Sequence, residues 1–304
     1  MTAGPGFQPP RPVDPAALSR AAERVARAPE PPWLHTEVGR RMAQRLLLIK
    51  LQPPRVARWW PLPGDDLSAL REAYPRAEVF DVQPPFMAPQ RVNKARNWLS
   101  WVGRKAPQAL PEAQVSAGSA DLVWSNMGLH AALDPQAVIS AWHRALAIDG
   151  FLMFSTLGPG SLPELRSLYA EEGWGPPMAP LVDMHDLGDM LVHAGFADPV
   201  MDQEELVLTW RDAHSALAEL RTLGANADPR RHPGLRTPGW RARLLQRLEQ
   251  LASQRADGRV ALRLEVAYGH AFRPPARARV APQTTIAVED LRAQARAHRG
   301  HAPR

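Results

Sequence analysis

The sequence predicts an α/β fold, doubly wound around a mostly parallel sheet. Between residues 55 and 156, short apolar segments of strand length alternate with segments of helical periodicity. The most apolar segment, Phe151–Thr156, fits a strand that is buried on both faces, as strands of parallel sheets usually are. Alternation at this spacing is typical of a parallel sheet with helices on both sides.

Two helices are expected before the first strand. Residues 1–12 are rich in glycine and proline and are predicted to form a flexible leader. Asp14 followed by Pro15 is a strong helix start, and this helix should end near Ala28, before a group of prolines. A second helix is predicted over 35–51, where apolar residues recur at helical spacing. Residues 1–32 thus form a leader and first helix.

The remaining elements follow from apolar runs, turn residues and helix starts. Strands are expected at 55–62, 78–82, 121–125, 151–156, 206–210 and 259–268. Helices are expected at 66–73, 134–147, 161–171, 185–195, 212–223 and 237–254, and residues 90–102 are expected to form a helix or a lid. Ser161 and Glu164 have the spacing of a capping box, which would start the 161–171 helix. Residues 273–304 lack apolar periodicity and are predicted to be a disordered basic tail.

The charge of the chain is concentrated at its C-terminal end. The 304 residues carry a net charge of +6, with a pI near 10.4. Seven arginines against Glu289 and Asp290 place +5 of this charge after residue 270. The rest of the chain is therefore nearly neutral, which argues against nucleic-acid binding by the main domain and leaves the tail as a candidate contact for an acidic partner.

Several classes of site are excluded by composition and motif. The absence of cysteine removes disulfides, cysteine-ligated zinc, iron–sulfur clusters and thiol nucleophiles. The chain has no phosphate-binding loop and no nucleophile elbow, and its histidines lack metal-ligand spacing, so no metal site is expected. The first 12 residues lack the apolar centre of a signal peptide, and the run Leu46–Ile49 is far shorter than a membrane span. A cytoplasmic location without membrane association is expected.

Candidate ligand-binding residues follow the predicted strands, because ligands of open α/β sheets bind at the carboxyl ends of the strands. Asp81, at the second strand, offers the paired acceptors that a ribose diol needs, or is simply a solvated turn acid. Asn126 follows the 121–125 strand and either faces a ligand or caps the next structure. His130, a little further on, is a candidate for either a structural or a site residue.

The segment Asp121–His130 (DLVWSNMGLH) resembles the fourth-strand motif of class I S-adenosylmethionine-dependent methyltransferases. More narrowly, the chain resembles BioC-type malonyl-acyl-carrier-protein O-methyltransferases of biotin synthesis. The likeness extends over residues 33–272 and is most specific over 150–272. The further segments that carry it are 33–42, 154–166, 182–191, 220–226 and 265–272.

This resemblance implies a seven-stranded methyltransferase domain over 33–272, with a helical insertion at about 161–195 and 212–254 above the site. It implies methyl transfer from S-adenosylmethionine to the free carboxylate of a malonyl thioester, carried by acyl carrier protein or another acyl thioester carrier. A carboxylate is already ionised at neutral pH, so the reaction needs little acid–base help. A cation should hold the carboxylate, and Arg166 and Arg221 are candidates, with surface ion pairs as their alternative role; His130 is a third candidate for substrate binding.

The chain departs from the family pattern after the first strand. Family members carry a glycine-rich loop there, whereas this chain reads WWPLPGDD over 59–66 and keeps only Gly64. The acid usual on that first strand is also missing. One interpretation is an active enzyme that binds S-adenosylmethionine through a modified site of Gly64, Asp81 and Asn126. The other is a catalytically inactive methyltransferase-like protein that serves as a binding or regulatory partner.

Overall fold

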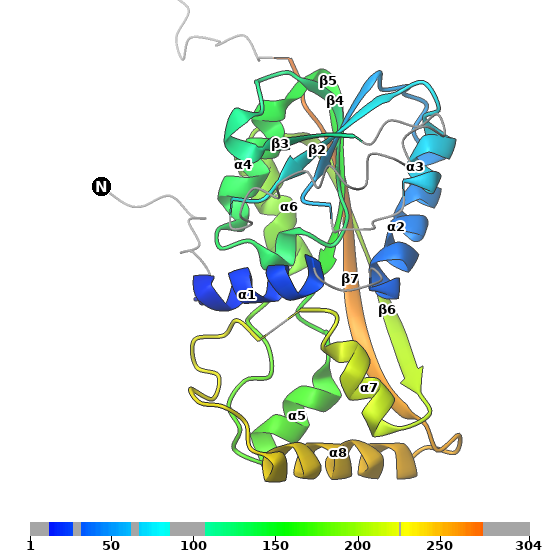
Figure 1. Cartoon of the computed structure of the whole chain (residues 1–304). Coiled ribbons are helices and arrows are strands. Elements are labelled where there is room, and N and C mark those ends of the chain that lie inside the picture. Colours follow the sequence, from blue (N-terminus) through cyan, green and yellow to red (C-terminus); the bar gives the residue numbers. More distant parts are fainter. Residues whose placement is uncertain (1–11, 27–31, 62–66, 86–106, 225, 276–304) are drawn as a thin grey trace, which may run out of the picture. The chain divides into compact units, whose positions relative to one another are not determined.

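The computed structural model describes residues 12–26, 32–61, 67–85, 107–224 and 226–275 (Figure 1). The chain divides into two units, Met1–Pro274 and Pro275–Arg304, and the description below concerns the first. Residues 1–11 of the predicted leader, the segment 90–102 and the predicted tail beyond 275 lie outside the described residues, as does Gly64.

One seven-stranded sheet forms the centre of this unit. Its strands follow the order β3-β2-β1-β4-β5-β7-β6. All neighbouring pairs are parallel except those of β7, which runs antiparallel to both β5 and β6. The predicted fold class, a doubly wound and mostly parallel sheet, is therefore confirmed. The strands are β1 (Arg55–Trp59), β2 (Glu78–Gln83), β3 (Gln108–Pro111), β4 (Ala120–Ser125), β5 (Leu146–Leu157), β6 (Ala197–Trp210) and β7 (Val260–Phe272).

Several strands differ from the sequence prediction: β1 ends at Trp59 rather than at 62, and β5 begins at Leu146 rather than at 151. β3 was not predicted, because its four residues are mostly exposed at the sheet edge and end in Pro111. β6 and β7 are longer than the predicted 206–210 and 259–268, since they pair with each other from Ala197–Phe272 to Trp210–Val260. Their paired ends extend beyond the other strands toward α7 (Ala213–Leu220) (Figure 1).

Helices cover both faces of the sheet (Figure 1). Side chains on one face of β1, β4 and β5, such as Val56 and Leu122, form an apolar cluster with α2 (Trp33–Leu46) and α3 (Ser68–Ala73). Side chains on the opposite face, such as Ala57 and Val123, form a second apolar cluster with α4 (Pro135–Ala145) and α6 (Met184–His193). Alternation along each strand thus fills two cores.

Several predicted helix starts are confirmed by capping hydrogen bonds. Asp14 accepts from the backbone of Ala16 and Ala17 at the start of α1 (Pro15–Ala26), and Asp134 accepts from Ala137 at the start of α4. Capping oxygens also start α6, α7 and α8 (Pro238–Ser253). Two short 3-10 turns, η2 (Glu112–Gln114) and η3 (Leu129–Ala131), follow β3 and β4.

The capping box predicted at Ser161 is wrong. Helix α5 (Pro163–Glu171) begins after Leu162, whose φ is 55°, without a side-chain cap. The Ser161 hydroxyl instead donates to the Glu265 carbonyl and accepts from the Glu265 amide, both at 3.1 Å. Glu164 accepts from the backbone and side chain of Arg263. Both residues therefore connect α5 to β7, and neither caps the first turn of α5.

Three helices, α5, α7 and α8, lie together beyond the end of the sheet, beside the extended part of β6 and β7 (Figure 1). Their buried leucines, Leu165, Leu244 and Leu248 among them, belong to the same apolar cluster as β7. Helix α6, which falls inside the range predicted as an insertion, packs against β6 and α4 instead. The helical part beyond the sheet is thus made by α5, α7 and α8.

Candidate functional site

A buried ion pair lies near the carboxyl ends of β1 and β2. The parallel register sets Arg58 opposite Asp81. Arg58 donates from Nε to Asp81 Oδ1 at 2.7 Å and from Nη2 to Oδ2 at 2.8 Å. The side chains are only 8% and 19% exposed, so this is a strong bidentate contact. Each carboxylate oxygen accepts up to two hydrogen bonds, and so retains one acceptor position.

Trp60 begins the loop that follows β1. Its φ is 57°, the left-handed region in which glycine is usual, and its backbone N–H donates to Val82 O at 2.8 Å. The indole Nε1 donates to Glu112 Oε2, also at 2.8 Å, and the ring is buried in the cluster that contains α4 and α6. Burial raises the pKa of Glu112, and the bond from Trp60 opposes this. The chain therefore keeps a glycine-like turn at Trp60 with the indole packed into the core.

Asn126, at the end of β4, is hydrogen-bonded on both sides of its amide. Nδ2 donates to the His35 carbonyl of α2 at 2.7 Å, and Ser155 Oγ donates to Oδ1 at 2.9 Å. Gly39 leaves room for this approach, because a Cβ there would lie 2.9 Å from Asn126 Nδ2. Asn126 thus joins α2 to β4 and β5, and its role toward a cofactor stays a prediction.

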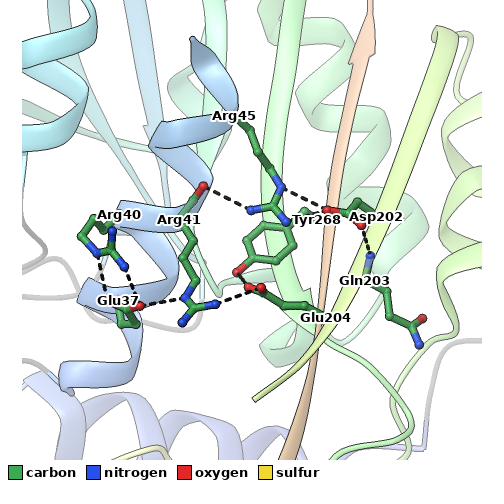
Figure 2. A network of polar contacts seen from close by, with 8 residues as sticks. All are labelled: Glu37, Arg40, Arg41, Arg45, Asp202, Gln203, Glu204 and Tyr268. Carbon is green, nitrogen blue, oxygen red and sulfur yellow. Dashed lines mark hydrogen bonds and ion pairs between the residues drawn. The ribbon is translucent and has the colours of Figure 1, made fainter. Parts of the chain in front are cut away.

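Helix α2 is also fixed to β6 and β7 by charged side chains, as Figure 2 shows. Arg41 pairs with Glu204 at 3.0 Å, and Arg45 pairs with Asp202 at 2.5 Å. The Arg45 guanidinium carbon lies 3.7 Å from the centre of the Tyr268 ring, and the Tyr268 hydroxyl donates to Glu204. These contacts hold α2 against strands that lie far from it in the sequence.

A cavity of about 880 Å³ lies among α1, α5, α7, α8 and the loop that precedes α8. His130, Ala131 and Leu157, which follow β4 and end β5, contribute to its wall, so the cavity borders the carboxyl ends of the strands. Most lining residues are apolar. In the part of the chain that the structure describes, the lining includes no carboxylate but includes five arginines: Arg24, Arg221, Arg231, Arg236 and Arg241.

The structure separates the three residues that the sequence suggests for substrate binding. Arg221 and His130 both line the cavity. Arg221 is exposed, and within the described residues it forms no ion pair. Arg166 is absent from the described lining and donates to the Pro159 carbonyl at 2.5 Å, with Met178 Sδ at 3.8 Å. The cavity thus brings together Arg221 and His130 without Arg166.

Sequence reasoning missed the other cavity arginines. Arg231 and Arg236 lie in a loop of low periodicity, where arginines ordinarily indicate a solvated surface. Arg231 pairs with Asp14 at 2.5 Å, which ties this loop to α1. Arg241 stands in the first turn of α8. The density of arginine between 221 and 241 is the one signal that could have indicated them.

The glycine-containing loop after β5 approaches a residue of the same chain. A Cβ on Gly158 or Gly160 would overlap with the Glu265 carboxylate of β7. Gly158 N–H also donates to the Glu265 carbonyl at 2.9 Å, and Gln203 Nε2 donates to Glu265 Oε2 at 3.2 Å. The Glu265 side chain therefore occupies the space that a Cβ on Gly158 or Gly160 would need.

Two negative findings concern the described residues alone. Their His, Asp and Glu side chains form no group of three or more that could hold a metal ion. None of their helices combines the length and the apolar character that crossing a bilayer requires.

The comparison with known proteins gives consistent results. No family model matches the chain. The malonyl-[acyl-carrier protein] O-methyltransferase of Laribacter hongkongensis is 39% identical over 277 residues, covering 87% of this chain and 90% of the relative. The protein of the same name from Gallionella capsiferriformans is 40% identical over 271 residues, covering 86% and 90%.

Solved structures support the fold. The YcgJ protein of Bacillus subtilis matches with a TM-score of 0.51 at 10% identity, covering 77% of this chain and 98% of the other. A Bacillus halodurans protein assigned as a methyltransferase matches with a TM-score of 0.50 at 15% identity, covering 77% and 99%. With the fold and the level of identity to these relatives in agreement, the chain belongs to the malonyl-[acyl-carrier protein] O-methyltransferase family.

Proposed function

We propose that this chain transfers a methyl group from S-adenosylmethionine to the free carboxylate of a malonyl thioester carried by acyl carrier protein, in the cytoplasm. The observation that supports this most directly is the cavity beside the strand ends, which has apolar walls, five arginines and no carboxylate among its described lining residues. Such a lining favours an anionic acyl group. The relatives from Laribacter and Gallionella are named for the same reaction.

The residues near the ends of β1 and β2 fit the methyl donor. Asp81 stands where an acid can accept both hydroxyls of a ribose, and its two oxygens keep an acceptor position each beside Arg58. The Trp60 indole is packed into the core and donates to Glu112 of η2. Gly64 and Asn126 remain predicted contacts of the donor. When bound, S-adenosylmethionine supplies a methyl group on a positively charged sulfur.

The protein's task is mainly to position the acceptor. A malonyl carboxylate is ionised at neutral pH, so no base has to activate it. Apolar walls exclude water, and cations orient the carboxylate toward the strand ends; such positioning lowers the barrier of a two-substrate reaction substantially. The ester product has no charge, so the arginines hold it more weakly than the substrate, which favours release.

The ion pair between Arg58 and Asp81 favours a second candidate function. Because the guanidinium neutralises the acid that would hold the ribose, a chain with this pair could bind the malonyl carrier without methylating it. Such a protein would act as a binding or regulatory partner in biotin synthesis.

Two measurements on the full chain separate these functions. Equilibrium dialysis with tritiated S-adenosylmethionine should show binding that is lost in Asp81→Ala. Expression in a biotin-requiring strain that lacks its own malonyl-acyl-carrier-protein methyltransferase should restore growth, again dependent on Asp81. Absence of donor binding at millimolar concentration, together with failure to restore growth, would exclude the methyltransferase and leave the binding function.

A further inference from the structure

An arginine and three aromatic side chains form one packed group beside the cavity. The rings of Tyr169 and Trp174 lie 5.4 Å apart and meet edge to face, and the ring of Trp240 lies 5.2 Å from Trp174 and 6.4 Å from Tyr169. The Arg236 guanidinium stacks on Trp240, with its central carbon 4.5 Å from the ring centre, and donates to the Trp174 carbonyl at 3.0 Å. These contacts fix the orientation of both Arg236 and Trp240.

Trp240 carries a hydrogen-bond donor that the described protein does not satisfy. Its Nε1 is buried, and no acceptor lies within hydrogen-bond distance among the described residues. An indole N–H can only donate, and buried donors in folded proteins nearly always have a partner. Trp240 contributes to the cavity wall, so an acceptor on a ligand bound beside its ring is a candidate partner for this N–H.

The same place carries positive charge. Arg236 uses Nη2 for the Trp174 carbonyl, and a guanidinium has five N–H donors in all, so others are available to the cavity that Arg236 lines. Burial raises the pKa of the Tyr169 hydroxyl, and the charge of Arg236 opposes this. Tyr169 lines the cavity as well.

We propose that Arg236 and Trp240 Nε1 hold the free carboxylate of the malonyl group, with the Tyr169 ring forming the wall beside it. This rests on the proposed function and names the specificity site within it. A planar carboxylate matches the paired donors of a stacked guanidinium, and a second oxygen meets the indole N–H. Arg221 and Arg241 are more exposed than Arg236, and they face the part of the ligand nearer to solvent.

The consequence is discrimination by charge at one end of the acyl chain. Methylation removes the negative charge and one acceptor oxygen, so the ester loses the contact with Arg236 while its remaining atoms are unchanged. The site therefore binds the substrate more tightly than the product. A cavity that selected only by apolar contact would bind both equally, or the ester more tightly.

The test compares two small probes by calorimetry with the full chain: the malonyl thioester of N-acetylcysteamine, and the same thioester with its free carboxylate methylated. The wild-type protein should bind the malonyl probe at least tenfold more tightly. Trp240→Phe and Arg236→Gln should each weaken malonyl binding about tenfold and change binding of the methylated probe less than twofold. Trp33→Phe, at an exposed tryptophan of α2 that is not among the described lining residues, is the matched control and should leave the preference unchanged.

An equal loss of affinity for both probes in Trp240→Phe, with an unchanged free energy of unfolding in urea, would overturn the proposal. A residue that only packs the cavity wall would affect both probes alike, whatever their charge. Equal binding of both probes by the wild-type protein, or no binding of either, would overturn it as well. Failure of the proposed function is recognised separately: the charge preference would persist, but no methyl group would pass from S-adenosylmethionine to the malonyl carrier.

Discussion

Arg58 and Asp81 face each other across β1 and β2 and share two hydrogen bonds of 2.7 and 2.8 Å. The family pattern has an acid on the first strand, and this chain has none there. Arg58 pairs with Asp81, the acid at the second strand that is proposed to contact the ribose. Any ribose contact of Asp81 would therefore be made by a carboxylate that already shares its charge with a guanidinium.

Removing the charge of Arg58 should strengthen donor binding. In Arg58→Gln, the Asp81 oxygens no longer share their charge with a guanidinium, and hydrogen bonds from ribose hydroxyls to a full carboxylate gain strength. We expect the affinity for S-adenosylmethionine to rise about tenfold, or about 1.4 kcal/mol, measured by calorimetry. In the control Asp81→Asn, which removes the charged acceptor, donor affinity should fall. Unchanged affinity in both variants would place the donor away from this pair.

Acidic pH should destabilise the protein through His35. Burial lowers the pKa of His35 to about 4, whereas an unfolded chain titrates near 6.5. Between these values the unfolded state binds more protons, so stability is lost as the pH falls from about 6.5 toward 4. From pH 7 to pH 5 this loss is about 2 kcal/mol. The free energy of unfolding, measured with urea, should fall between pH 7 and pH 5 by about 2 kcal/mol less in His35→Leu than in the wild-type protein. An equal fall in both proteins would contradict the assignment.

Two glycines that approach Met201 should respond oppositely to alanine. In Gly269→Ala the new Cβ would overlap with the Phe154 ring and lie 2.8 Å from Met201 Sδ, so the free energy of unfolding should fall by about 1–3 kcal/mol. In Gly188→Ala, inside α6, the Cβ would lie 3.7 Å from Met201 Cγ, which is an ordinary contact. Because alanine has a higher helix propensity than glycine, the free energy of unfolding should rise by about 0.5–1 kcal/mol. Thermal and urea unfolding measure both; equal effects of the two substitutions would contradict the packing described for β7.

Asn126 should be needed to hold α2 against β4 and β5. Asn126→Ala leaves the His35 carbonyl without its donor and the Ser155 hydroxyl without its acceptor in a buried site. We expect the free energy of unfolding to fall by about 2–4 kcal/mol. Ser155→Ala removes one of these bonds, while the Met127 N–H that also donates to Ser155 Oγ keeps the Ser155 carbonyl as its acceptor, so this variant should cost about half as much. A stable Asn126→Ala protein that loses only donor binding would instead support a direct contact with the cofactor.

The regular part of the fold could be predicted from the sequence because its signals are local. The apolar run over 151–156 and the capping acids Asp14 and Asp134 each act within a few residues, and the structure confirms them. β3 and the first half of β6 could not be predicted, since they are set by pairing with distant strands. Ser161 was misassigned for the same reason: its partner, Glu265, lies on β7.

The candidate site could be predicted only in part. Strand ends indicated Asp81 and Asn126, but not that Arg58 and His35 engage them, because those contacts depend on register and on the position of α2. Arg221 was indicated through family resemblance and lines the cavity, whereas Arg166 turns to the Pro159 carbonyl. Arg236 and Trp240 come together through stacking, which a linear pattern does not reveal.

Methyl transfer to the malonyl carrier tests the central claim most directly. The purified full chain is incubated with malonyl-acyl carrier protein and S-adenosylmethionine, and the intact carrier is weighed by mass spectrometry. The account predicts a carrier that gains one methyl group, which mild base removes as expected for an ester, and no gain with Asp81→Ala. A carrier that binds the wild-type chain but keeps an unmodified malonyl group would contradict it.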